Sequence, residues 1–127
     1  MLMLACTAKQ AEQKEYEQAA LIHNAMLDKA GKLEDTLKLM LADSAWLNQQ
    51  DSVKAILAAL ENWEKQLVEV PGNEDHEHNH GAHEHHDHEA APVEVTPEQM
   101  LLIQQDLESR LTNIRKRLQQ ISLTEKQ

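Results

Sequence analysis

Residues 16–47 read YEQAALIHNAMLDKAGKLEDTLKLMLADSAWL and carry the clearest structural pattern of the sequence. Mostly apolar residues recur at alternating steps of three and four, which is the spacing of the buried face in a left-handed helical bundle. The repeat keeps its phase across Gly31, although a glycine inside a helix costs about 1 kcal/mol relative to alanine. The sequence therefore predicts one long first helix. The positions on its buried face are Tyr16, Ala19, His23, Met26, Ala30, Leu33, Leu37, Met40, Ser44 and Leu47.

Three further signals mark where this helix and the next one begin and end. Thr7 and Gln10 have the spacing of a capping box, so we expect the first helix to begin there. Polar residues 48–51 end the repeat, and Asp51 is the expected N-cap of a second helix. Pro71 is expected to end that helix, because proline cannot continue one. The predicted buried face of the second helix consists of Val53, Ile56, Leu60, Trp63, Leu67 and Val70.

A third helix is predicted over residues 96–123. In the stretch Thr96-Pro-Glu-Gln99, threonine is the expected N-cap, proline suits the first helical position and glutamine closes a capping box. The predicted buried face of this helix consists of Met100, Ile103, Leu107, Leu111, Ile114, Leu118 and Ile121.

The sequence thus predicts an all-α protein, a three-helix antiparallel bundle with a long first helix. Residues 7–70 form a helical hairpin, residues 71–95 a long loop between helices two and three, and residues 96–123 the third helix of the same bundle. The composition agrees, since aromatic residues make up only 2% of the 127 residues and there are three Gly and three Pro. Sheet proteins are richer in aromatic residues and in turns.

The acidic charge and the histidines gather in residues 71–95, called the histidine segment below. The formal net charge is −10, and this segment holds seven acidic residues and no Lys or Arg. It also holds seven of the eight histidines. Few large apolar residues occur in it, so it cannot bury enough surface to offset the entropy of ordering. We expect a loop that is disordered or is ordered by metal.

The histidine spacing predicts metal binding. Neutral imidazole is a good ligand for zinc, nickel and copper ions, and a tetrahedral zinc site needs about four nitrogen, oxygen or sulfur ligands. The segment offers an imidazole at every second or third residue, and its carboxylates add oxygen ligands. We expect Zn²⁺ first, with Ni²⁺ or Cu²⁺ as alternatives. The candidate ligands are His76, His78, His80, His83, His85, His86 and His88.

Other interpretations of these residues stay open at this point. The segment is alternatively a passive linker, or a loop that compacts in mild acid because seven imidazolium groups would cancel seven carboxylates. His23 lies on a buried helix face, where it is either a core histidine bonded to a neighbour or a fixed metal ligand. Trp46 lies off that face and is expected to contact a partner or to cap the bundle.

Several classes of function are not expected. The sequence has no Gly-rich phosphate loop, no His-Glu-x-x-His and no credible Ser-His-Asp set, so we predict no enzymatic activity. The negative charge argues against a nucleic-acid partner. No run of 18 apolar residues exists, so no complete transmembrane helix is expected. The expected partners are divalent metal ions, a membrane reached only through a lipid anchor, and a second copy or another protein on the helical faces.

Residues Met1-Leu-Met-Leu-Ala5-Cys6 resemble the end of a bacterial lipoprotein signal, in which a small residue precedes a lipidated cysteine. The resemblance implies an exported protein, periplasmic or at the cell surface, anchored by lipid on Cys6. The apolar run is shorter than the 7–15 residues of a signal. We therefore expect residues 1–6 to be the remnant of a longer signal that starts upstream of Met1. The alternative is a cytosolic protein with an apolar start.

Two family resemblances rest on short motifs. His23-Asn-Ala-Met26, Asn62-Trp63 and Val95-Thr-Pro-Glu-Gln-Met100 resemble a family of small helical bacterial lipoproteins without assigned activity, over nearly the whole chain. Val95-Thr-Pro-Glu-Gln99 is also similar to the Leu-Thr-x-x-Gln motif of periplasmic stress proteins of the Spy, CpxP and ZraP type. Those proteins usually carry two copies of the motif, and this chain has one.

The predicted function is metal buffering, capture or sensing by an exported helical lipoprotein. The alternative is a structural or chaperone-like helical module, in which the apolar faces bind a partner and the histidine segment is a passive linker. Loss of the segment distinguishes the two, because only the first function depends on it.

Overall fold

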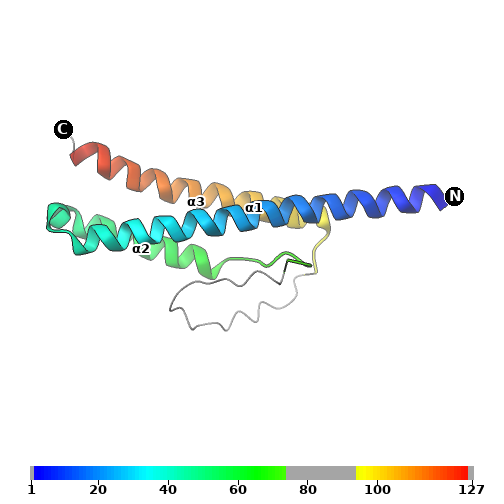
Figure 1. Ribbon diagram of the computed structural model, residues 1–127, viewed down its shortest axis with the longest axis horizontal. Coiled ribbons are helices and arrows are strands. Elements are labelled where there is room, and N and C mark those ends of the chain that lie inside the picture. The colour runs from blue at the N-terminus through cyan, green and yellow to red at the C-terminus, as the bar shows by residue number, and fades with distance from the viewer. Residues whose placement is uncertain (1, 74–93, 126–127) are drawn as a thin grey trace. The chain divides into compact units, whose positions relative to one another are not determined.

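The computed structural model describes residues 2–73 and 94–125, with side chains described for residues 7–73 and 94–122. Within these ranges the chain is all-helical and contains no strand. The elements are α1 (Leu2–Ala42), the 3₁₀ helix η1 (Ser44–Gln49), α2 (Gln50–Lys65) and α3 (Pro97–Glu125), as Figure 1 shows. The prediction of three α-helices with a long first one is confirmed for this part of the chain.

Helix α1 runs without a break through Gly31, as its apolar repeat predicts. It begins at Leu2, so Thr7 lies inside the helix and the predicted capping box at Thr7 is wrong. The reason is local, because leucine, methionine and alanine before Thr7 all favour the helical conformation. The predicted buried face is confirmed from Ala19 to Met40, and Tyr16 is half-buried.

The break between α1 and α2 comes earlier than predicted. The Asp43 carboxylate accepts a hydrogen bond from the Ala45 amide at 2.9 Å and thereby caps η1. The predicted buried positions Ser44 and Leu47 are wrong, since both are exposed in η1. Asp51 is not the N-cap of α2 but lies in its first turn, where a negative charge suits the helix dipole.

Helix α2 ends at Lys65, well before Pro71, so the predicted helix through Val70 is wrong. Its end is closed by hydrogen bonds to the third residue back, from Gln66 N to the Trp63 carbonyl at 3.0 Å and from Leu67 N to the Glu64 carbonyl at 3.2 Å. Residues 67–70 then run outside any helix, and Leu67 is only half-buried.

Pro71 and Gly72 form a tight turn after this stretch. Asn73 N donates to the Val70 carbonyl at 3.0 Å, and Gly72 has a φ of +83°. Proline followed by glycine is typical of a type II turn, because the second central residue needs a positive φ. Proline also disfavours a helical conformation at the residue before it, which keeps Val70 out of α2.

The predicted start of α3 is confirmed in detail. The Thr96 hydroxyl accepts from Gln99 N at 3.1 Å, and the Gln99 side chain accepts from Thr96 N at 2.9 Å. Pro97 is the first residue of the helix. This reciprocal capping box satisfies two backbone amides at the helix start.

The chain divides into two compact units. Unit 1 consists of Met1–Ala25 and Val68–Asp106, and unit 2 of Met26–Leu67 and Leu107–Gln127. Helices α1 and α3 are each divided between the two units, α1 after Ala25 and α3 after Asp106. The core of unit 1 contains Ala19, Val70 and Met100, with half-buried Tyr16, Ala20, Val68, Val95 and Leu101 packed against them.

The core of unit 2 is built from the predicted apolar faces of all three helices. Trp63 in α2 donates its indole N–H to the backbone carbonyl of Leu107 in α3 at 2.8 Å. Figure 1 shows η1 turning the chain back between α1 and α2. The buried residues of unit 2 are Met26, Leu27, Ala30, Leu33, Leu37, Met40, Val53, Ile56, Leu60, Trp63, Leu107, Leu111, Ile114 and Leu118.

Candidate functional site

The predicted metal ligands His76, His78, His80, His83, His85, His86 and His88 lie outside the described residues. The predicted lipidation site Cys6 lies in α1, and its side chain is not among those described. The ligand set and the lipid anchor therefore stay predictions.

The two ends of the histidine segment are described, and both belong to unit 1. At the first end, Asn73 and Asn24 exchange two side-chain hydrogen bonds of 2.9 and 3.2 Å, and Asn73 is buried. At the second end, Val95 packs against the core of unit 1 and Thr96 caps α3. The described residues on both sides of the histidines thus belong to the same compact unit.

His23 is fully buried in unit 1, as its place on the helix face predicts. Its Nδ1 lies 3.0 Å from Oε1 of Gln104, which is also fully buried. The Gln104 amide nitrogen donates to the Val68 carbonyl at 2.8 Å, and this fixes which end of the amide faces the histidine. Nδ1 of His23 therefore donates to Gln104, and the interpretation as a core histidine bonded to a neighbour is confirmed.

The other ring nitrogen of His23 faces a carboxylate. Nε2 lies 3.5 Å from Oε2 of Glu69, and the Glu69 side chain is 43% exposed. Glu69 lies in the non-helical stretch between α2 and the histidine segment. His23 thus connects α1 to α3 through Gln104 and to the start of the segment through Glu69.

Neither Gln104 nor Glu69 was predicted from the sequence. The buried face of α3 passes through Gln104, and Ile103, which the apolar pattern selected, is only half-buried. The spacing from Met100 to Leu107 allows either position, and a rule that seeks apolar residues chooses isoleucine. Nothing in the sequence marked Glu69 as a neighbour of His23, because the predicted second helix included Glu69.

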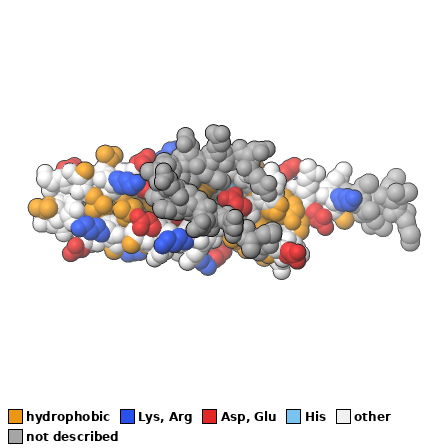
Figure 2. Space-filling view, turned by 90° about the horizontal axis from the view of Figure 1, so that it is seen from below, with side chains coloured by type: hydrophobic (Ala, Val, Ile, Leu, Met, Phe, Trp, Pro, Cys, Tyr) orange, Lys and Arg blue, Asp and Glu red, His pale blue; other side chains and the backbone are white. Residues whose placement is uncertain are grey.

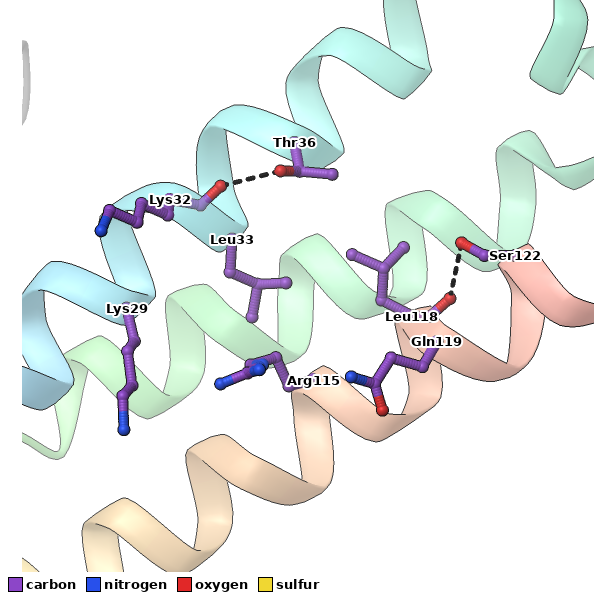
Figure 3. A pocket seen from close by; sticks show the side chains of 8 residues that line it. All are labelled: Lys29, Lys32, Leu33, Thr36, Arg115, Leu118, Gln119 and Ser122. Carbon is purple, nitrogen blue, oxygen red and sulfur yellow. Dashed lines mark hydrogen bonds between the residues drawn. The ribbon is translucent and has the colours of Figure 1, made fainter.

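Unit 2 has a groove of about 630 Å³ between α1 and α3. Figure 3 shows Leu33 and Leu118 between these helices, with Lys29 and Arg115 beside them. Lys32 also lines the groove and is paired with Asp28 at 2.9 Å. The groove thus combines an apolar floor with cationic side chains. Its lining residues are Lys29, Lys32, Leu33, Thr36, Arg115, Leu118, Gln119 and Ser122.

One ion pair on α1 shifts a pKa. The Glu34 carboxylate lies 2.6 Å from the Lys38 ammonium, one helical turn away. This hydrogen bond, together with the charges of Glu34, Asp35 and Glu64, raises the pKa of Lys38 above its ordinary value.

The described part of the chain holds neither a cluster of metal-ligating side chains nor a helix that could span a membrane. In residues 2–73 and 94–125, no three His, Cys, Asp or Glu side chains are grouped so that they could hold a metal ion. Over the same residues, no helix has both the length and the apolar character needed to cross a membrane.

Comparison of the chain with models of protein families, with curated proteins and with solved structures found no match. The resemblances to helical lipoproteins and to periplasmic stress proteins therefore stay expectations.

Proposed function

We propose that this protein binds divalent transition metal ions, zinc foremost, through the histidine segment and acts in metal buffering, capture or sensing without catalysis. One observation carries the proposal: seven of the eight histidines of the chain lie within residues 76–88. Imidazole is the side chain that zinc, nickel and copper sites use most readily at neutral pH. Carboxylates between the histidines add oxygen ligands and a negative field that attracts cations.

The attachment of the segment to unit 1 supports this proposal. Asn73 is held by Asn24 before the histidines, and Val95 packs into the core after them. Tethering both ends in one compact unit limits the volume that the ligands can explore. It therefore lowers the entropy that a metal ion must overcome when it gathers several imidazoles.

We further propose that the three helices form an antiparallel bundle that presents the segment, exported and anchored by lipid at Cys6. The apolar residues before Cys6 and the small Ala5 are what this proposal rests on. Mass spectrometry of the protein isolated from a bacterial membrane fraction tests it. A diacylglyceryl group on Cys6, absent from Cys6→Ser, is the expected result, and an unmodified Cys6 would exclude a lipid anchor.

The metal function is tested by competition for zinc against a chromogenic chelator at neutral pH. The native chain is compared with a variant in which all seven histidines of the segment are replaced by glutamine. We expect submicromolar zinc affinity with a fixed stoichiometry in the native chain, and at least a hundredfold loss in the variant. Weak binding without fixed stoichiometry in the native chain would reduce the segment to a linker.

A matched control separates imidazole binding from simple charge attraction. In this second variant the six carboxylates Glu74, Asp75, Glu77, Glu84, Asp87 and Glu89 become amides while the histidines stay. We expect it to keep most of the zinc affinity, because imidazoles are the principal ligands. A loss as large as that of the glutamine variant would make charge attraction the main cause of binding.

A second candidate function is a helical interaction module. Four leucines are mostly exposed: Leu21 at 70%, Leu39 at 71%, Leu47 at 69% and Leu102 at 58%. On the face drawn in Figure 2, hydrophobic, acidic and basic side chains are interspersed. A partner that binds equally to the native chain and to the glutamine variant would support this function.

A further inference from the structure

The groove between α1 and α3 in unit 2 carries its positive charge at one end. Figure 3 shows Lys29, Lys32 and Arg115 at that end. Lys32 is paired with Asp28 at 2.9 Å, whereas no residue that the structure describes forms an ion pair with Lys29 or Arg115. These two cations can therefore bind an anion without breaking a contact within the described part of the chain.

The positive charge continues along α3 beyond the groove. Residues 109–124 include four basic residues, Arg110 and the run Arg115–Arg117, and no Asp or Glu. The whole chain has a formal net charge of −10, so this stretch stands out against an acidic background. It therefore attracts an anion locally toward the groove.

The opposite end of the groove is uncharged. The Thr36 hydroxyl donates to the Lys32 carbonyl at 3.0 Å, and the Ser122 hydroxyl donates to the Leu118 carbonyl at 3.3 Å, as Figure 3 shows. Each hydroxyl thus directs its proton to its own helix and not into the groove. Leu33 and Leu118 form the floor between the two ends.

This distribution of charge fits a ligand with an anionic head and an apolar body. We propose that the groove binds a single-chain carboxylic acid, with the carboxylate at Lys29 and Arg115 and the alkyl chain over Leu33 and Leu118. A partner helix with carboxylates along its length would place some of them at the uncharged end, so it fits less well. This inference does not rest on the proposed function, because none of the groove residues that carry it belongs to the histidine segment.

The dimensions of the groove suit a chain of medium length. Its volume of about 630 Å³ lies within the usual range for small-molecule sites. The lining residues extend from 29 to 36 on α1 and from 115 to 122 on α3, which is about 10 Å along each helix. An extended alkyl chain of about eight to ten carbons spans this length.

The test titrates sodium decanoate into the full native chain, without added metal, while ¹H–¹⁵N NMR follows the backbone amides. We expect saturable shifts centred on Leu33 and Leu118, with a Kd of about 0.1 mM. Octanoate should bind about fourfold more weakly, because its shorter chain buries less apolar surface. Decanol has the same chain without the charge and should bind more weakly by at least about tenfold.

A pair of double variants tests the position of the carboxylate. Lys29→Gln combined with Arg115→Gln should weaken decanoate binding by at least about tenfold. The matched control, Lys54→Gln combined with Lys116→Gln, removes the same charge outside the groove and should bind within about twofold of the native chain. All four side chains are exposed, so both variants are expected to keep the native helix content, which circular dichroism measures.

Four results would overturn the site. The first is the absence of shifts in the groove at millimolar decanoate. The second is equal binding of decanol and decanoate, since the cations would then contribute nothing. The third is an equal loss of binding in the two double variants, which would make net charge the cause. The fourth is a set of groove resonances that move with protein concentration alone, which would assign the groove to a second copy of the chain.

Discussion

Gln104 holds His23 in one orientation inside unit 1, with the amide Oε1 and the ring Nδ1 3.0 Å apart. The pair joins α3 to α1, and a second bond from Gln104 to the Val68 carbonyl ties in the non-helical stretch after α2. Both side chains are fully buried. This single glutamine therefore satisfies polar groups on two other parts of the chain.

Replacing Gln104 with leucine should lower the free energy of unfolding by about 2–3 kcal/mol. The volume is nearly kept, but the His23 Nδ1–H and the Val68 carbonyl lose their shared partner in the core. Urea unfolding followed by circular dichroism measures the loss. Gln105→Leu is the matched control, because Gln105 is exposed and its change should stay within about 0.5 kcal/mol. Equal effects at the two positions would show that the buried bonds contribute nothing.

Thr96→Ala should destabilise the protein by about 1 kcal/mol, because it removes the oxygen that accepts from Gln99 N. Thr112→Ala on the same helix is the control. The Thr112 hydroxyl donates to the Glu108 carbonyl at an exposed site, so its loss should change stability by less than about 0.5 kcal/mol. Thermal unfolding of both variants compares the effects, and a larger loss at Thr112 would contradict the capping role.

Replacing each of the two described glycines with alanine should change the free energy of unfolding in opposite directions. A Cβ at Gly31 meets nothing within 4 Å, so Gly31→Ala should raise the free energy of unfolding by about 0.5–1 kcal/mol. Gly72 has a φ of +83°, and Gly72→Ala should lower it by about 1–2 kcal/mol. Urea unfolding of both variants gives the signs. A destabilised Gly31→Ala would mean that α1 bends at this glycine in solution.

The Glu34–Lys38 pair should give a small, pH-dependent contribution to stability. Because the pKa of Lys38 is raised in the folded chain, the contribution is present below the ordinary lysine pKa and is lost as pH rises through the folded value. The Lys38 side chain is 57% exposed, so the pair contributes only about 0.3–0.5 kcal/mol. Lys38→Gln should remove this dependence in unfolding curves measured between neutral and strongly alkaline pH. If the variant loses as much stability at alkaline pH as the native chain does, groups other than Lys38 cause that loss.

Features set by neighbouring residues were predictable from the sequence. The start of α3 follows from the four residues Thr96–Gln99, and the uninterrupted α1 follows from an apolar repeat that keeps its phase at Gly31. His23 was predicted in the core because it shares that repeat.

Features set by distant contacts were not predictable. The end of α2 depends on an irregular stretch whose Val68 carbonyl bonds to Gln104, 36 residues away. The early end of α1 involves Gln50, whose side chain lies 3.4 Å from the carbonyls of Met40 and Leu41. Apolar periodicity could not find the buried Gln104, since it selected the apolar Ile103 at the neighbouring position.

Zinc K-edge X-ray absorption, recorded on the native chain with less than one equivalent of zinc, shows directly whether imidazoles bind the ion. The spectrum identifies the type of ligand around the zinc ion without any assumption about the number of zinc ions bound per chain. We expect a four-coordinate zinc with ligands at about 2.0–2.1 Å and outer-shell scattering from two or more imidazole rings. A shell of oxygen ligands without imidazole scattering would contradict metal binding by the histidine segment.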